Sequence, residues 1–431
     1  MTSTELVVRG GRIIDATGER TADIRIRDGV IAEVGTGLDA ATVLDAQGCV
    51  VGPGLVDLHT HLREPGNEEA ETIASGTRAA ALGGFTAVVA MPNTQPAADD
   101  VTVIEAVRNA AAADGSCDVF PAGCITKGRA GKELAPIGEL YAAGVRVFTD
   151  DGNCVDDPMM MRRALEYSLA FPGAVLAQHA EDARLAAGGS MHLGEWSSRL
   201  GIPGRAAEAE TVIIARDVVL AAATGAPVHF LHVSTAAAVE LVRDAKRCGL
   251  PVTAEAAPHH FTLTDACCAS YDPVFKVHPP LRSQADVDAI KAGLADGTID
   301  AIATDHAPHA PETKERPFED APPGMLGLET VLALAHTELV ETGVVSMAAM
   351  WATLSANPAR IARCSDHGHT IAPGVPANLC VFDPTTTWEV DPMRQASKSR
   401  NTPYAGRKLT GRVRHTIWRG VPTVIDEGLT R

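Results

Sequence analysis

The chain has 431 residues, of which 45% are hydrophobic and 21% are charged, a composition typical of a folded globular protein and not of a disordered one. The formal net charge of −17 argues against long-range attraction to nucleic acid or to an anionic membrane surface, because those partners require a clustered positive field. An anionic small molecule would have to be held by local positive charges.

The cysteines and the start of the chain bear on the cellular compartment. Nine cysteines are scattered without a CxxC pair, which predicts neither a disulfide framework nor a cysteine zinc site. Residues 1–10 lack a basic segment followed by an apolar core, and no apolar run has the length of a membrane span. We therefore expect a soluble protein of the cytoplasm.

Both ends of the sequence show the alternation of apolar and polar residues that is typical of β-strands. Near the beginning, short strands separated by glycine turns are predicted at 5–8, 12–15, 23–27 and 30–34. A matching pattern returns at 377–382, 388–390 and 412–419. We predict that residues 1–53 and 371–431 together form one small β-sandwich domain.

Residues 54–370 have a different hydrophobicity pattern, in which short apolar runs alternate with longer Ala-rich segments of helical period. Eight such runs are predicted strands: 55–59, 85–91, 119–124, 145–149, 175–179, 228–232, 252–256 and 299–304. The predicted helices are 68–82, 99–113, 158–170, 206–223, 235–248, 284–294 and 328–341. This α/β alternation favours a (β/α)₈ barrel of the TIM type, with a doubly wound open sheet as the alternative.

The ends of the predicted strands carry metal-binding residue types. The first run ends in His59 and His61, whose side chains share one face because an extended chain repeats every two residues. Four later runs end in Asp150-Asp151, His179, His232 and Asp305. Imidazoles and carboxylates at these positions favour two divalent ions that share a bridge over a single structural zinc.

Three further histidines lie close to these runs. His229 precedes His232 by three residues, so an extended strand points the two to opposite faces, and we expect His229 to be buried behind the site. His259 and His260 follow the seventh run and are weaker candidates for lining the site.

Two long motifs resemble a known family. Residues 57–66 (DLHTHLREPG) and 303–309 (ATDHAPH), with Lys314 beyond them, resemble the signatures of dihydroorotases in the amidohydrolase superfamily. The resemblance extends through 91–94, 258–260, 279–282 and 324–329 and covers most of the chain. No lysine occurs in 144–152, a feature similar to the bacterial type I members, whose two metals share an aspartate instead of a carboxylated lysine.

The resemblance implies a ligand set for two zinc ions. His59 and His61 would hold one zinc with Asp305, and His179 and His232 would hold the other. The bridge is assigned to Asp151, with Asp150 as the alternative.

The resemblance also implies a substrate and a reaction, the reversible hydrolysis of the cyclic amide of (S)-dihydroorotate to N-carbamoyl-L-aspartate in the biosynthesis of UMP. Asp305 would act as the catalytic base and acid. Arg63 and Asn93 would bind the substrate carboxylate, and His309 would contact the ring. The other expected substrate contacts are Pro323, Gly324 and His278, the last at a position where related enzymes usually have asparagine.

Other readings remain open at this level. The first is a hydantoinase or allantoinase, which the absent lysine and the Arg-Glu-Pro-Gly motif at 63–66 disfavour. The second is an inactive homologue that serves as a structural partner of aspartate carbamoyltransferase. Association with that enzyme, or assembly into a homo-oligomer, is also compatible with an active protein.

Overall fold

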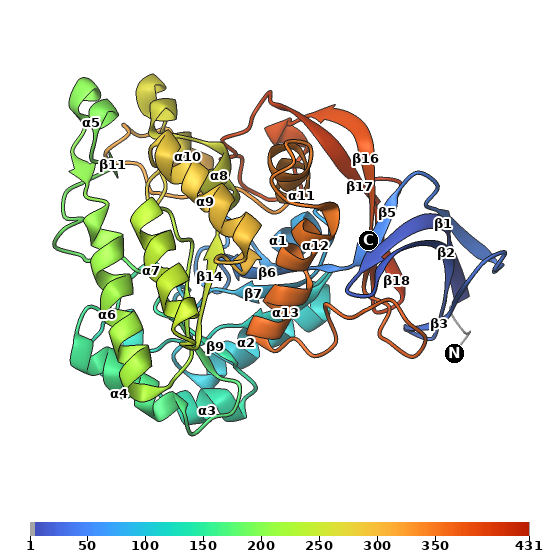
Figure 1. Cartoon of the computed structure of the whole chain (residues 1–431), viewed down its shortest axis with the longest axis horizontal. Coiled ribbons are helices and arrows are strands. Elements are labelled where there is room, and N and C mark those ends of the chain that lie inside the picture. Colours follow the sequence, from blue (N-terminus) through green and yellow to red (C-terminus); the bar gives the residue numbers. More distant parts are fainter. Residues whose placement is uncertain (1–4, 431) are drawn as a thin grey trace.

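The structure is a computed structural model that describes residues 5–430. It is a mixed α/β protein in which the helices lie outside a set of parallel strands, while a separate sheet occupies one end of the molecule (Figure 1). None of the helices within the described range is both long and apolar enough to cross a membrane.

All eight predicted strands of the middle region are confirmed in position, although most are shorter than predicted. Three form one parallel sheet: β6 (Leu55–Thr60), β7 (Phe85–Ala90) and β8 (Asp118–Pro121). Five form another: β9 (Val147–Phe148), β10 (Val175–Gln178), β13 (Val228–Phe230), β14 (Val252–Ala256) and β15 (Ala301–Ile302). Parallel bridges Gly123–Phe148 and Thr60–His306 connect the two sheets at both edges.

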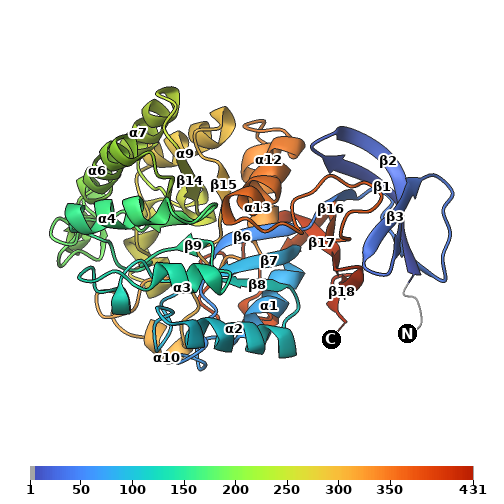
Figure 2. The ribbon, with the colours of Figure 1, turned by 90° about the horizontal axis from the view of Figure 1, so that it is seen from below.

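The predicted helices also occur, with shifted ends. They are α1 (Ile73–Leu82), α2 (Val101–Asp114), α4 (Pro158–Ser168), α6 (Glu208–Thr224), α7 (Ala236–Arg247), α9 (Gln284–Asp296) and α11 (Val331–Ala335), which continues as a π-helical turn at His336–Val340. The first begins five residues later than predicted because Thr72 caps it, its hydroxyl accepting from the Ser75 amide. Figure 2 shows these helices around the strands.

Several short elements were not predicted. They are α3 (Ile137–Ala142), α5 (Glu195–Leu200), α8 (Pro258–Thr262), α10 (Pro311–Lys314), α12 (Met347–Leu354), α13 (Ala356–Ala362), β11 (Met191–His192) and β12 (Gly204–Arg205). Most are too short to show a helical or strand period in the sequence.

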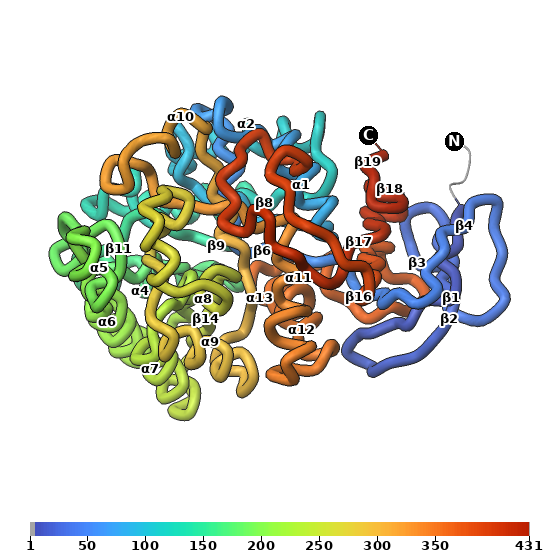
Figure 3. Tube along the Cα trace, turned by 90° about the horizontal axis from the view of Figure 1, so that it is seen from above, coloured from blue at the N-terminus to red at the C-terminus, as the bar shows by residue number. Residues whose placement is uncertain are grey.

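Strands from both ends of the described chain form one nine-stranded sheet. Its strands are β1 (Glu5–Asp15), β2 (Gly18–Arg27), β3 (Val30–Gly35), β4 (Thr42–Asp45), β5 (Val50–Pro53), β16 (Leu379–Glu389), β17 (Lys408–Trp418), β18 (Val421–Ile425) and β19 (Gly428–Leu429). The ends meet where β5 pairs antiparallel with β16, with Val51 opposite Val381. Figure 3 shows the blue and red strands at the same end of the molecule.

Two predicted breaks in this sheet were wrong. Segments 5–8 and 12–15 form the single strand β1, in which a register shift between Val8 and Gly11 absorbs the glycine pair. Gly10 has φ +74°, and a Cβ on Gly11 would lie 2.3 Å from Val51 Cγ2, so both glycines are needed by the bulge. Likewise, 377–382 and 388–390 belong largely to one strand, β16.

The C-terminal segment also reaches the other end of the parallel strands. Asn401 Nδ2 donates to the carbonyls of Ala307 (3.0 Å) and Gly324 (3.1 Å), and its Oδ1 accepts from the His309 amide (3.2 Å). The C-terminal segment therefore connects the loop that contains Ala307 and His309 with the loop that contains Gly324, and both loops belong to the sequence motifs described above.

Candidate metal centre and substrate pocket

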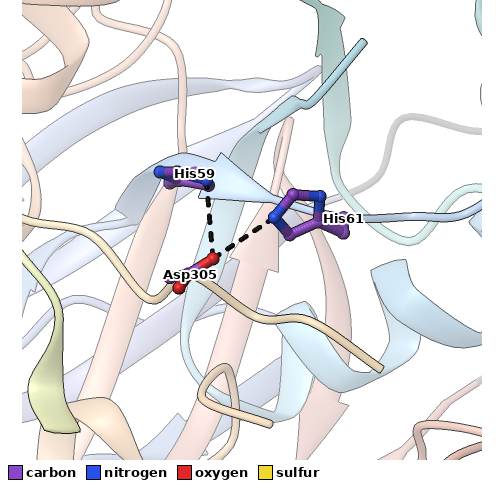
Figure 4. A group of neighbouring side chains, drawn as sticks. All are labelled: His59, His61 and Asp305. Atoms are coloured by element: carbon purple, nitrogen blue, oxygen red, sulfur yellow. Dashed lines mark hydrogen bonds and ion pairs between the residues drawn. The ribbon is translucent and has the colours of Figure 1, made fainter. Parts of the chain in front are cut away.

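The carboxyl ends of the parallel strands bring the predicted ligands together. His59 lies on β6 and His61 follows it, and both rings point toward Asp305, which follows β15 (Figure 4). Asp305 Oδ1 lies 3.5 Å from His59 Nε2 and 3.2 Å from His61 Nε2. All three side chains are buried, so their polar atoms depend on one another or on a bound group.

Asp151 lies at the centre of four imidazoles. Its Oδ2 is 3.4 Å from His59 Nε2 and 3.5 Å from His61 Nε2, and its Oδ1 is 3.3 Å from His179 Nδ1 and 3.6 Å from His232 Nε2. An aspartate with both oxygens turned to different imidazoles has the geometry of a shared ligand.

Asp150, the alternative, faces the other way. Its Oδ1 accepts from the backbone amides of Ile125 and Thr126, each at 2.9 Å, and its Oδ2 accepts from the Thr126 hydroxyl. Its acceptor positions are thus used to hold the loop after β8, and the geometry favours Asp151 over Asp150 as the shared ligand.

The charges of the cluster are strongly coupled. Burial raises the pKa of Asp151, but the surrounding imidazoles outweigh burial and hold it well below the usual value. Burial lowers the pKa of His59, but Asp151 and Asp305 outweigh it and raise that pKa well above the usual value. Burial also lowers the pKa of His179, but Asp151 and Glu181 outweigh burial and raise that pKa to about 9. The site thus strongly attracts positive charge.

The donor atoms fit a divalent cation. Two sets of ligand atoms lie within 4.8 Å of one another: His59, His61 and Asp305, and His59, Asp151 and His232. His179 Nδ1 and His232 Nε2 approach to 2.9 Å, an arrangement that a shared proton or a cation must stabilise, because two imidazole lone pairs repel. Across residues 5–430, His59 Nε2 has no hydrogen-bond partner despite its burial.

Three site residues have a backbone conformation that side chains rarely adopt. The φ angles of Arg63, His232 and Asp305 are +62°, +33° and +46°. Non-glycine residues in this region cost on the order of 1–3 kcal/mol each and cluster at functional sites. The surrounding structure therefore holds these side chains in place at the expense of stability.

A cavity of about 230 Å³ opens beside the cluster. Its lining includes all six residues expected to contact the substrate: Arg63, Asn93, His278, His309, Pro323 and Gly324. Asp151, His179, His232 and Asp305 line the same cavity. The two sets of residues, inferred from separate motifs, thus face one common space.

The arginine in this cavity is available to an anion. Arg63 Nε donates to the Pro308 carbonyl (3.1 Å), and among the described residues no carboxylate lies within ion-pair distance of its guanidinium. Burial lowers its pKa to about 10, so the side chain remains charged at neutral pH.

The other lining residues have distinct roles in the free protein. Asn93 Oδ1 accepts from His61 Nδ1 (2.9 Å), so the amide orients a ligand as well as facing the cavity. His309 Nε2 donates to the Pro323 carbonyl (2.7 Å). His278 Nε2 is buried without a hydrogen-bond partner in residues 5–430, and burial lowers the pKa of this ring to about 3, so it is neutral.

The other three histidines noted in the sequence, His229, His259 and His260, lie behind or beside the ligand cluster. His229 is buried behind the site, where its Nε2 lies 3.0 Å from Glu255 Oε2. His259 Nε2 is 3.9 Å from Asp305 Oδ2, and His260 Nε2 donates to the Pro279 carbonyl (3.1 Å).

Sequence reasoning missed residues that support the ligands from outside. Glu255 contacts His59, Glu181 Oε2 lies 3.8 Å from His179 Nε2, and Asn401 holds the substrate loops. Of these, only Glu255 could have been noticed in the sequence, because it is a carboxylate within the predicted strand 252–256 (VTAEA), whose neighbouring residues are apolar.

Comparison with known proteins agrees with this geometry. A family model described as "Dihydro-orotase-like" matches residues 48–238. A dihydroorotase from Streptomyces coelicolor is 49% identical over 431 residues, covering 99% of this chain and 100% of that protein. A dihydroorotase from Mycobacterium tuberculosis is 48% identical over 426 residues, covering 98% of each.

Solved structures show how widely the fold is shared. L-hydantoinase (dihydropyrimidinase) from Arthrobacter aurescens superposes with a TM-score of 0.89 at 25% identity, covering 99% of this chain and 97% of that one. A dihydropyrimidinase from Brevibacillus agri gives 0.86 at 23% identity, over 99% and 96%, a likeness that concerns the fold alone. Near-complete coverage at nearly half identity, by contrast, identifies a family, and this chain belongs to the dihydroorotase family.

Proposed function

We propose that this protein hydrolyses the cyclic amide of (S)-dihydroorotate to N-carbamoyl-L-aspartate, and closes the ring in the reverse direction, as a step of pyrimidine biosynthesis. The observation that supports this substrate most strongly is the half-buried, charged Arg63, which lines the same cavity as the ligand cluster. A guanidinium without a protein carboxylate suits a substrate carboxylate.

The ligand cluster suits two zinc ions. His59, His61 and Asp305 would hold one, His179 and His232 the other, and Asp151 would be shared, in agreement with its central position. Zinc bound there would lower the pKa of water and polarise the ring carbonyl.

The protein's own groups would then bind the substrate and move the proton. Arg63 and the Asn93 amide would hold the carboxylate and fix the ring, with His278, His309, Pro323 and Gly324 around it. Burial raises the pKa of Asp305, but nearby histidines outweigh it and keep that pKa well below the usual value, so the carboxylate is ionised. It would accept a proton from the attacking water and return it to the ring nitrogen as the C–N bond breaks.

Three finer features of the architecture belong to the same proposal. The bridges Gly123–Phe148 and Thr60–His306 support closure of the eight strands into a (β/α)₈ barrel. The end of β5 at Pro53 and the return of the chain near residue 371 support a barrel of 54–370. The described strands at the two ends of the chain pack around their own apolar cluster, which supports a β-sandwich of 1–53 and 371–431, of which residues 1–4 and 431 lie outside the described structure.

Localisation and assembly follow from function. We place the enzyme in the cytoplasm, where its nine free thiols would remain reduced. A homo-oligomer or a complex with aspartate carbamoyltransferase remains compatible with this assignment.

Turnover and metal analysis test the proposal directly. Purified protein should contain about two zinc ions per chain and hydrolyse dihydroorotate in preference to hydantoin and allantoin. Preference for hydantoin, whose ring lacks a carboxylate, would instead support the activity named for the Arthrobacter aurescens structure. Failure to turn over any of the three would favour a structural role.

A further inference from the structure

Glu255 is a buried carboxylate that the reaction proposed above does not use. It lies in β14 and is buried. Burying a carboxylate costs several kcal/mol unless hydrogen-bond donors surround it. Two donors are present: His59 Nδ1 at 2.9 Å from Oε1, and His229 Nε2 at 3.0 Å from Oε2.

The second nitrogen of His229 also has a hydrogen-bond partner. His229 Nδ1 lies 2.8 Å from the Thr253 hydroxyl, which belongs to the same strand as Glu255. A neutral imidazole has one N–H and one lone pair. Because Nε2 donates to Glu255, Nδ1 is left to accept from Thr253. The hydrogen bonds of Thr253, His229 and His59 therefore form one consistent set, in which Thr253 donates to His229 and both histidines donate to Glu255.

This set of hydrogen bonds determines which nitrogen of His59 faces the cation site. In the neutral ring that metal binding requires, a proton on Nδ1 leaves the lone pair on Nε2. The Nε2 atom has no hydrogen-bond partner among the described residues and lies 3.4 Å from Asp151 Oδ2 and 3.5 Å from Asp305 Oδ1. An imidazole must offer a lone pair to bind a metal ion.

We propose that Glu255 is a positioning residue that keeps the His59 proton on Nδ1 and the Nε2 lone pair directed at the cation. The inference rests on the proposed metal centre and adds to it a residue outside the ligand set. His61 has a neutral acceptor for the same purpose, the Asn93 amide. A charged acceptor holds a donor more strongly, so Glu255 contributes more to cation affinity than an amide would.

Zinc affinity of the metal-free protein, measured by competition with a chelator, tests this role. Glu255→Gln should weaken the binding of zinc alone by about 10–100-fold, since the amide can present an N–H where an acceptor is needed. The matched control is Glu329→Gln, which removes a half-buried carboxylate that accepts from the Ala396 amide and contacts none of the proposed ligands. It should leave zinc affinity unchanged.

A conservative variant separates positioning from packing. Glu255→Asp keeps the charge but changes the shape, whereas Glu255→Gln keeps the shape but loses the charge. Positioning requires that the Asp variant binds zinc more tightly than the Gln variant. The reverse order, or native affinity in the Gln variant, would overturn the role of Glu255. Absence of zinc binding by the unaltered protein would instead overturn the metal centre itself.

A measurement on the unaltered protein does not depend on variants that fold. Imidazole ¹⁵N spectra of the zinc-loaded protein should show His59, assigned through its backbone, with a protonated Nδ1 and a metal-shifted Nε2. A metal-shifted Nδ1 in His59 would contradict the proposal whatever the variants do.

Discussion

The two halves of the site are built in different ways. The ligand half comes from strand ends, where His59, Asp151, His179 and His232 are buried and converge within a few ångströms. The substrate half comes from loops, and Asn401, far away in the sequence, ties two of them together. The comparison indicates that the chemistry is placed by the rigid strands and the specificity by segments that need outside support.

The largest expected effect belongs to the ligand half. Asp305→Asn should lower turnover of dihydroorotate by about 10²–10⁴-fold, because it removes the ionised carboxylate that we propose moves the proton. Steady-state kinetics measures the loss, and circular dichroism should show an intact fold. A variant with a near-native rate would remove Asp305 from proton transfer.

Arg63→Ala should produce the next largest effect, confined to substrates with a carboxylate. Loss of a charged hydrogen-bond donor costs about 1.5–3 kcal/mol, which corresponds to roughly 10–150-fold in kcat/KM for dihydroorotate. Residual turnover of hydantoin should not change. The exposed Arg162, paired with Glu166 on α4, provides a control, since Arg162→Ala should leave both activities intact. Equal losses for both substrates would contradict the assignment.

Asn401→Ala tests the dependence of the substrate half on the C-terminal segment. With the contacts to Ala307, His309 and Gly324 removed, kcat/KM should fall by about tenfold, the value of one or two net hydrogen bonds. Zinc content should remain native, as measured by metal analysis. If zinc were lost in parallel with activity, the two halves would not be separable as described.

The smallest effect concerns stability at a position outside both halves. Burial raises the pKa of Glu329 to about 7 from a model-peptide value of 4.5. The folded chain therefore keeps a proton that the unfolded chain releases, and stability falls as pH rises from about 4.5 to 7. Glu329→Gln should remove this penalty and stabilise the protein on the order of 1 kcal/mol at pH 8, with little difference near pH 4.5. Thermal melts at both pH values measure it, and equal shifts would contradict it.

Periodicity located most of the architecture in advance. The eight apolar runs all contain strands, and the HxH spacing placed His59 and His61 on one face, because both patterns are local properties of an extended chain. The break predicted between 5–8 and 12–15 failed because pairing with β2 and β5 carries β1 through the glycine pair. Short elements such as α13 lie below the length at which a period can be recognised.

The sequence by itself determined the parallel α/β alternation, the residue types at the strand ends and the family to which their motifs belong, since these depend on spacing and side-chain chemistry. Only the tertiary structure shows that Asp151 faces the imidazoles while Asp150 holds a loop, because adjacent residues point to opposite sides and the direction of the site is set by distant strands. It also revealed Glu255 behind His59, and Asn401 beneath the loops. His59 and Glu255 are 196 positions apart in the sequence, and Ala307 and Asn401 are 94 positions apart. No local sequence pattern can predict contacts over such separations.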